Sequence, residues 1–340
     1  MKKFLLVCVL LCLGASFRSP ACTTAIVSAG ASADGRPMIW KQRDTPKEGN
    51  YMKHYKGPVH AFTALTASGN QVWCGANDAG FMIANNLSYN LRPDSLSKLP
   101  MRAGAIMKEA LGACSTVEDF EHYIATMAQP RCVTANFAVV DNEGGAAYFE
   151  VWDYGWKRYD VPENGILFRT NYSYSGFEAK GKGYGRHDLM EHLTALHGPV
   201  GYSAEWFLHV GRIIPIARPT TTASIVLEGG DSPIIWAAAG YTPGCYAIPV
   251  WVAAGEDIPA CLGESKAVSS VASKLRKGSD ARTLEDFVIP TMQKAEAREF
   301  KEGRALERRF ARKGFDIESV REFNAGADKR FEKLSKKILK

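Results

Sequence analysis

The sequence of 340 residues lacks the features of several common functional classes. It has no Cys-x-x-Cys or paired Cys/His spacing, which argues against a zinc or iron–sulfur site, and we expect neither a metal nor a cofactor. It has no internal repeat and no low-complexity segment, and its composition excludes a disordered chain. The formal net charge of +6 falls by three if Lys2, Lys3 and Arg18 are removed, which is too little to indicate nucleic-acid binding.

Long hydrophobic runs are also missing, except for one near the N-terminus. That run, residues 4–13, follows the positive pair Lys2 and Lys3 and precedes Ser19-Pro20-Ala21, so it has the three parts of a secretory signal peptide. We expect residues 1–21 to be a signal peptide and the protein to be periplasmic or secreted, with no integral membrane segment. The chain from 22 to 340 is expected to be one domain, with a core over 22–262 and a helical region over 263–340.

Cleavage at this point would leave Cys22 as the first residue. An N-terminal cysteine carries a thiol and a free α-amine on one residue, so the nucleophile and its base arrive together. An α-amine has a pKa of about 7.7 to 8.0, so near neutral pH it can accept the thiol proton. The other cysteines after residue 21 are expected to be mostly buried, with one or two disulfides left open.

Most of the chain up to about residue 252 is predicted to form antiparallel strands. A turn is expected over 75–80, before a strand that begins at Phe81. Two hairpins are predicted, in which 135–140 pairs with 146–151 and 223–227 pairs with 234–237.

Helices are predicted at four places. Ser115 and Glu118 have capping-box spacing before a helical pattern, and 103–111 and 188–196 are further candidates. Near the C-terminus, apolar residues recur three or four positions apart after the expected N-cap Asp316, which predicts one long helix packed on the core. This stripe consists of Val320, Phe323, Ala327, Phe331, Leu334 and Ile338.

The opening of the predicted domain resembles a known family. Cys22-Thr23-Thr24-Ala25-Ile26, Asp34-Gly35 and the run from Trp40 to Asp44 are similar to the start of the N-terminal-nucleophile (Ntn) amide hydrolases, in the choloylglycine hydrolase and acyl-coenzyme A:6-aminopenicillanic acid acyltransferase group. In that group an Arg-x-x-Asp motif follows the nucleophilic cysteine. Lys41 and Asp44 stand at the matching positions here, with Arg43 as the alternative cation.

The resemblance continues through residue 250 and implies roles for further side chains. The segment from Asn77 to Asn86 matches one that ends in an oxyanion-hole asparagine, which favours Asn86 and leaves Asn85 open. Asn136 lies in a strand–turn–strand segment of the acyltransferase branch. Thr170-Asn171 and Arg186 match a Thr-Asn pair beside the nucleophile and an arginine that follows it.

These roles fit the chemistry of the residues themselves. Asp44 can orient the α-ammonium, and an asparagine NH2 can stabilise an oxyanion. A cation from Lys41, Arg43 or Arg186 can favour a thiolate or hold a substrate carboxylate.

The family resemblance implies an α+β fold, the four-layer αββα sandwich of two antiparallel sheets. The apolar stripe near the C-terminus adds a C-terminal helical extension to it. The resemblance also implies a cysteine amidohydrolase that cleaves a linear C–N amide bond of a small N-acyl substrate through an acyl-enzyme at Cys22, and the predicted signal peptide implies that this enzyme is exported. Two alternatives stay open: an Ntn dipeptidase, and a non-catalytic envelope protein lipidated at Cys22. Hydrolysis is preferred over acyl transfer, and a homo-oligomer is left open.

Overall fold

The computed structural model describes residues 21–91, 101–177 and 182–339. The predicted signal peptide, apart from Ala21, lies outside the described residues. Thirteen strands pair into two antiparallel sheets, whose orders are β10-β1-β2-β11-β12-β13 and β3-β4-β5-β6-β7-β8-β9. The strands are β1 (Ala21–Val27), β2 (Met38–Asp44), β3 (Tyr51–Lys56), β4 (Ala61–Ala67), β5 (Gln71–Asn77), β6 (Met82–Leu87), β7 (Ala135–Val140), β8 (Ala146–Trp152), β9 (Gly155–Asp160), β10 (Ile166–Arg169), β11 (Thr221–Glu228), β12 (Ile234–Ala238) and β13 (Ile248–Trp251).

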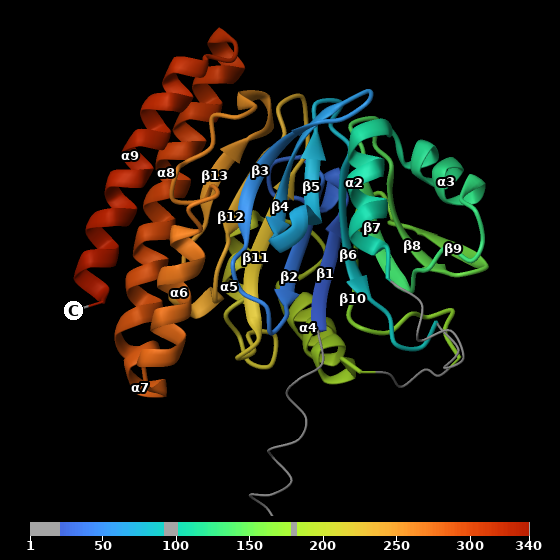
Figure 1. Cartoon of the computed structure of the whole chain (residues 1–340), viewed down its shortest axis with the longest axis horizontal. Helices are drawn as coiled ribbons and strands as arrows, with labels where there is room; N and C mark the ends of the chain where they lie inside the picture. Colours follow the sequence, from blue (N-terminus) through green and yellow to red (C-terminus); the bar gives the residue numbers. More distant parts are fainter. Residues whose placement is uncertain (1–20, 92–100, 178–181, 340) are drawn as a thin grey trace, which may run out of the picture.

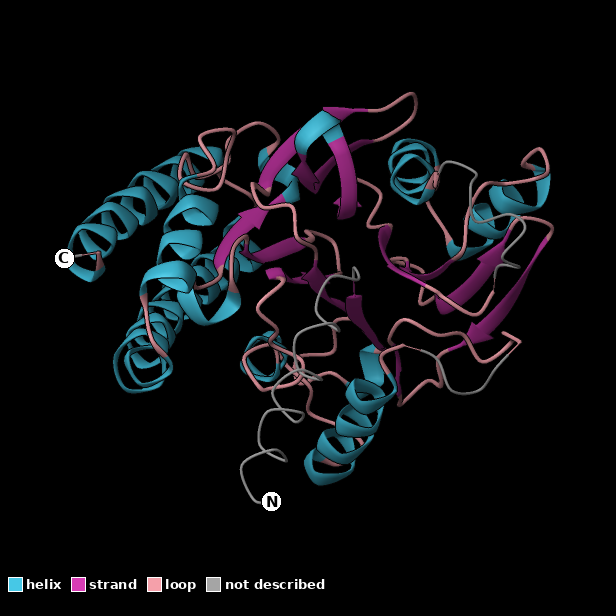
Figure 2. Ribbon diagram, turned by 60° about the horizontal axis from the view of Figure 1, so that its bottom comes forward, coloured by secondary structure: helices cyan, strands magenta, loops and turns pink. Residues whose placement is uncertain are grey.

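The two sheets pack face to face, with β1 and β2 of the first sheet against β6 and β7 of the second. Helices cover both outer surfaces (Figures 1 and 2): α2 and α3 lie on the second sheet, and α4, α5 and α8 on the first. The predicted four-layer αββα sandwich is therefore confirmed. The helices are α2 (Ala103–Ala113), α3 (Val117–Thr126), α4 (Tyr184–His197), α5 (Ala204–Val210), α6 (Ala267–Gly278), α7 (Ala281–Thr283), α8 (Ile289–Lys313) and α9 (Ile317–Ile338).

Side-chain alternation along the strands builds the layers. In β6, Met82 and Ala84 point into the core between the sheets, whereas Ile83 packs against the helices outside. Both predicted hairpins are confirmed, because β7 pairs with β8 and β11 pairs with β12. The region between the sheets is largely apolar, so polar side chains on its strands mark a site.

Two local predictions need correction. The turn expected over 75–80 is shorter, because β5 continues to Asn77, whose Oδ1 accepts from the backbone N–H groups of Ala79 and Phe81 and closes the turn. The capping box of α3 is shifted by one residue. Thr116 has the extended backbone that an N-cap requires, and Asp119 supplies the reciprocal carboxylate.

The long helix predicted after Asp316 is confirmed as α9, whereas α8 was expected only as part of the helical region over 263–340. Asp316 caps α9 by accepting from the N–H of Glu318, and the apolar stripe of α9 is buried or half-buried against the core. In Figure 1, α8 and α9 stand beside β13 at the edge of the first sheet. A buried pair between Arg212 and Glu296, with N–O distances of 2.8 Å, ties α8 to the loop after α5. None of the described helices has an apolar stretch long enough to cross a membrane.

Candidate active site

Cys22 is the second residue of β1, an interior strand that pairs with β10 on one side and β2 on the other. It is half-buried, and in register it lies directly opposite Arg43. Thr24, two residues further on, makes its side-chain hydrogen bonds to the second sheet. Side chains two apart on a strand share a face, so the Cys22 thiol points to the interface between the sheets.

Asn171 and Arg186 hold the backbone of Cys22. Asn171 Oδ1 accepts from the backbone N–H of Cys22 at 2.8 Å and from Arg186 Nη2 at 2.6 Å. Arg186 Nη1 donates to the carbonyl oxygen of Cys22 and to Thr23 Oγ1. In the uncleaved chain this Cys22 nitrogen belongs to the peptide bond with Ala21. It stands in for the α-amine that cleavage would release.

Gly183 permits this close packing. It precedes the first turn of α4 with a φ of +101°, which favours glycine. A Cβ at this position would come within 2.8 Å of Arg186 Nη2 and 3.0 Å of the backbone nitrogen of Asn171. Glycine therefore lets α4 start against the 170–171 segment, so that Arg186 can reach Cys22.

Asn86 presents an unpaired amide between the sheets. The hydroxyl of Tyr148 donates to Thr24 Oγ1 at 2.9 Å, and Thr24 in turn donates to Asn86 Oδ1 at 2.7 Å. This relay fixes the orientation of the Asn86 amide. Asn86 is fully buried, and its Nδ2 has no hydrogen-bond partner among the described residues. A fixed, unpaired N–H donor on the face that carries the thiol has the character of an oxyanion-hole donor.

The neighbouring Asn85 is engaged elsewhere. Lys41 is buried, and its ammonium donates to the backbone oxygen of Asn85 and, at 3.1 Å, to Asn85 Oδ1. Burial lowers the pKa of Lys41. The side chain of Asn85 therefore anchors Lys41, and Asn86 is the better candidate for the oxyanion hole.

Asn136 supports Asn171, the residue that binds the Cys22 nitrogen. It lies opposite Asn86 in the β6–β7 register, and its Nδ2 donates to the backbone oxygens of Thr170 and Tyr172 at 3.3 and 3.1 Å. These two residues flank Asn171. Asn136 thus fixes the segment that presents Asn171 to Cys22.

Asp44 lies at the end of β2, opposite Ala21 in the β1–β2 register. Its Oδ1 accepts from Thr221 Oγ1 at 2.5 Å, and its Oδ2 is buried without a partner in the described part of the chain. Burial raises the pKa of Asp44 to about 6, although the charge of Arg186 opposes this shift. The unpaired oxygen is an acceptor beside the peptide bond whose cleavage would create an ammonium group.

All nine residues singled out in the sequence lie around the start of β1 and the facing strands. Sequence reasoning assigned no role to Thr24, Tyr148 or Gly183. Thr24 could have been found from alternation, since it lies two residues after Cys22 on the same strand. Tyr148 comes from a strand distant in sequence, and no local signal marks its hydrogen bond to Thr24.

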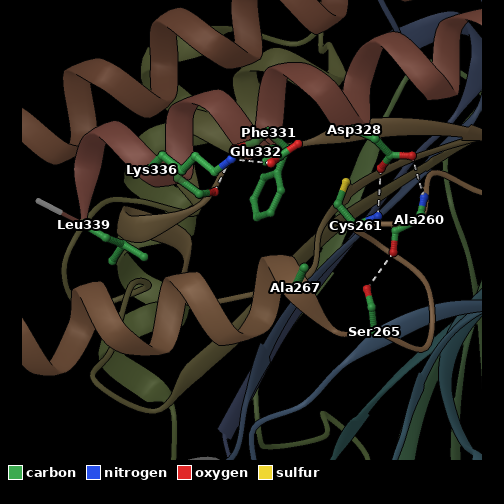
Figure 3. A pocket seen from close by; sticks show the side chains of 10 residues that line it. Ala260, Cys261, Ser265, Ala267, Asp328, Phe331, Glu332, Lys336 and Leu339 are labelled. Carbon is green, nitrogen blue, oxygen red and sulfur yellow. Dashed lines mark hydrogen bonds and ion pairs between the residues drawn. The ribbon is translucent and has the colours of Figure 1, made fainter.

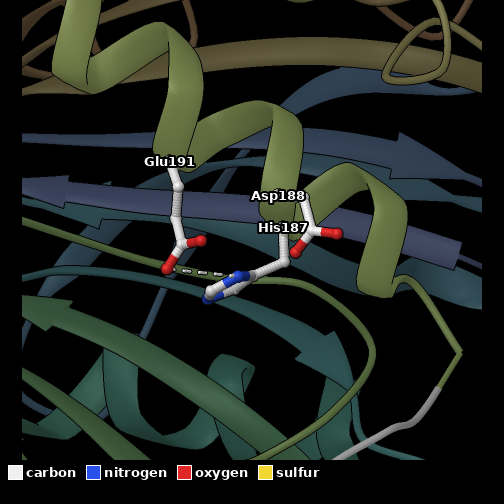
Figure 4. A group of neighbouring side chains, drawn as sticks. All are labelled: His187, Asp188 and Glu191. Carbon is white, nitrogen blue, oxygen red and sulfur yellow. Dashed lines mark ion pairs between the residues drawn. The ribbon is translucent and has the colours of Figure 1, made fainter.

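Two other features include none of these nine residues. A cavity of about 430 Å³ opens beside α9, where Asp328 accepts from the backbone N–H groups of Ala260 and Cys261 (Figure 3). On α4, ligand atoms of His187, Asp188 and Glu191 lie within 4.8 Å of one another (Figure 4). The two carboxylates are exposed.

The group of His187, Asp188 and Glu191 fits a metal poorly. One ring nitrogen of His187, Nε2, already shares a hydrogen bond of 2.8 Å with the hydroxyl of Tyr174.

The six cysteines of the described residues are all free thiols, so none of the disulfides left open by the sequence is formed.

The arrangement can be set beside known proteins. No protein-family model matches this chain, and no curated protein matches it in sequence. Among solved structures, it is similar to the Caenorhabditis elegans ortholog of N-acylethanolamine-hydrolyzing acid amidase, with 14% identity over 60% of this chain and 92% of the other and a TM-score of 0.49. A mutant of conjugated bile acid hydrolase from Clostridium perfringens gives 10% identity, 67% and 92% coverage and a TM-score of 0.44.

A third similar structure is penicillin V acylase from Agrobacterium tumefaciens, with 12% identity, 67% and 85% coverage and a TM-score of 0.40. With identities of 10–14% and TM-scores below 0.5, these similarities do not assign an activity, so activity has to be inferred from the geometry around Cys22.

Proposed function

We propose that this protein is an exported cysteine amidohydrolase that is activated when the chain is cut between Ala21 and Cys22. The observation that carries the proposal is the hydrogen bond from the Cys22 nitrogen to Asn171 Oδ1, within a constellation that includes Arg186 and the unpaired amide of Asn86. Cleavage would convert that nitrogen into an α-amine on the same residue as the thiol, so that no second residue is needed as the base.

The reaction follows from these positions. The α-amine takes the thiol proton, and the Cys22 sulfur forms a bond to the carbonyl carbon of a linear amide. The oxyanion accepts from Asn86 Nδ2, an interaction for which one donor contributes roughly 3–4 kcal/mol. The C–N bond then breaks, the leaving amine receives the proton, and an acyl thioester remains on Cys22. Water hydrolyses this thioester and restores the thiol.

The second acceptor for the new amine is Asp44. Its unpaired Oδ2 and Asn171 Oδ1 would both accept from the ammonium form, and this would keep the amine beside the thiol. Arg186 contacts the carbonyl oxygen of Cys22 and Asn171 together, so it positions the nucleophile. The substrate is expected to be a small N-acyl compound, and water is preferred to a second amine as the acyl acceptor.

The test is the intact mass of the exported protein, followed by turnover of a panel of N-acyl amides and dipeptides. We expect a chain that begins at Cys22 with a free amine, hydrolysis of at least one linear amide, and an acyl adduct on Cys22 when the reaction is stopped with acid. A diacylglyceryl mass on Cys22 with a blocked amine would instead establish the lipid-anchored alternative and exclude this mechanism. Hydrolysis of dipeptides alone would favour the dipeptidase alternative.

A further inference from the structure

Arg43 is a buried cation that forms no ion pair with any of the described residues. It lies opposite Cys22 in the β1–β2 register and has 4% of its surface exposed. No carboxylate forms an ion pair with it among residues 21–91, 101–177 and 182–339. Asp44, its neighbour in sequence, belongs to the opposite face of β2 by strand alternation. Burial lowers the pKa of Arg43 to about 10, so the side chain is still charged at neutral pH.

Two β-bulges, one in each sheet, supply the side chains that contact Arg43. In β5 the pairing with β4 shifts so that Trp73 has no partner across the ladder, and in β11 a shift against β2 leaves Thr222 unpaired. Arg43 Nη1 donates to Thr222 Oγ1 at 3.0 Å, and the guanidinium lies over the Trp73 ring, 4.3 Å from its centroid. Bulges re-aim side chains and are frequent beside active sites.

This contact leaves two N–H donors unsatisfied. Arg43 Nε and Trp73 Nε1 are buried, and neither has a hydrogen-bond partner in the described part of the protein. Buried donors without partners lower the stability of a fold, so a pair of them on two stacked side chains indicates that a ligand atom completes the set. Two N–H donors, one of them charged, suit a carboxylate.

We propose that Arg43 and Trp73 form an anion subsite beside Cys22, which selects amides that carry a carboxylate close to the scissile carbonyl. The subsite deepens the proposed function and rests on it for the identity of the substrate. The subsite could bind a carboxylate on either half of the amide. The carboxylate lies on the amine half in an N-acyl α-amino acid and on the acyl half in the monoamide of a short dicarboxylic acid. The substrate test below separates them.

The first experiment needs no amide substrate. Iodoacetate and iodoacetamide both alkylate a thiol with loss of iodide, and they differ in that only iodoacetate is anionic. We expect the rate ratio of iodoacetate to iodoacetamide at Cys22 to exceed that of free glutathione by tenfold or more. The ratio should fall to near the glutathione value in Arg43→Met and severalfold in Trp73→Phe, which removes Nε1 and keeps an aromatic ring for stacking.

Arg298→Met provides the matched control, because Arg298 is an exposed arginine of α8 and its loss changes the net charge by the same amount. Its ratio should equal that of the wild type. A wild-type ratio no higher than that of glutathione, or an equal fall in Arg298→Met and Arg43→Met, would overturn the subsite. If Arg43→Met does not fold, Trp73→Phe decides alone, and an unchanged ratio in that variant counts against the proposal.

The second experiment compares kcat/KM for an N-acylglycine with that for its glycinamide, and for a succinic monoamide with its methyl ester. We expect a preference of tenfold or more for the acid in one pair, which identifies the half that carries the carboxylate, and loss of this preference in Arg43→Met. Equal turnover of acid and neutral partner in both pairs would overturn the subsite while leaving the amidase function intact. If no amide at all is hydrolysed, the proposed function fails, and the alkylation ratio still decides whether the anion subsite exists.

Discussion

The backbone nitrogen of Cys22 donates to Oδ1 of Asn171 at 2.8 Å, although 149 positions separate the two residues. The contact depends on Asn136, which holds the backbone on both sides of Asn171, and on Arg186, which shares the same oxygen. The Cys22 nitrogen, which the proposed cleavage would turn into the N-terminus, is thus bound by a side chain whose own position is determined by two further residues.

Cys22→Ala should abolish turnover and leave the fold intact, because the side chain is half-buried and is replaced by a smaller one. Residual activity is expected to be below one part in about 10⁴ of the wild type, since the nucleophile itself is lost. Steady-state kinetics and thermal melting measure the two effects. In the wild type, iodoacetamide should label Cys22 before the fully buried Cys74. Full activity after stoichiometric labelling of Cys22 would contradict the mechanism.

Asn86→Ala should lower kcat by roughly a hundredfold to a thousandfold with little change in KM, because the lost hydrogen bond is made to the transition state. Thr24→Val is the paired variant. It removes the hydroxyl that orients the Asn86 amide and keeps the shape of the side chain, so we expect about a tenfold loss in kcat. Lower stability with unchanged kcat in both variants would mean that the relay from Tyr148 is structural only.

Gly183→Ala should disturb the placement of Arg186. The φ of +101° and the approach of 2.8 Å to Arg186 Nη2 both disfavour a Cβ, so we expect a loss of about 1–3 kcal/mol in stability and a fall in kcat. Gly185→Ala is the matched control two residues later, since a Cβ there meets no atom within 4 Å. That change should stabilise the helix by up to about 1 kcal/mol. Urea denaturation and kinetics on both variants check the prediction.

The burial of Asp44 predicts that protein stability depends on pH differently before and after cleavage at Cys22. In the uncleaved chain its pKa is raised from 3.8 to about 6, so the folded state holds the proton more tightly than the unfolded state. Stability should therefore fall as the pH rises from about 4 to about 6, by about 2–3 kcal/mol. After cleavage, the Cys22 ammonium would favour the charged carboxylate, and this fall should disappear.

Denaturation between pH 4 and pH 7 measures the change in the free energy of unfolding for two chains that both carry Cys22→Ala. One retains the peptide bond before residue 22, and the other begins at residue 22. Asp44→Asn should flatten the curve of the first chain. A fall of equal size in both chains would show that the carboxylate does not interact with the new N-terminus.

Local sequence patterns predicted the two hairpins and several helices, because strand alternation, turn residues and helix caps act over a few positions. The four-layer arrangement was predicted from the family resemblance and not from these patterns. The shifted cap at Thr116 shows the limit of this reasoning, since Ser115 and Thr116 are chemically similar and only backbone conformation separates them. The site was predicted as a set of residues from their resemblance to a family. The geometry of the site could not be predicted from the sequence, because tertiary packing brings its contacts together. Asn85 engages the Lys41 ammonium. Trp73 and Thr222 contact Arg43, and no local pattern in the sequence indicates this.

The interior position of β1 would affect how well a chain that begins at Cys22 resists trimming by aminopeptidases. Hydrogen-bonded ladders to β2 and β10 flank the strand, and the pairing with β2 begins at Ala21 itself, so an N-terminus at Cys22 would have little freedom to fray. Aminopeptidases act on ends that can be drawn out into an extended, accessible form. The pairing of β1 with β2 and β10, which orients the Cys22 thiol, would therefore also protect Cys22 from removal by aminopeptidases. Loss of that residue would remove the proposed nucleophile.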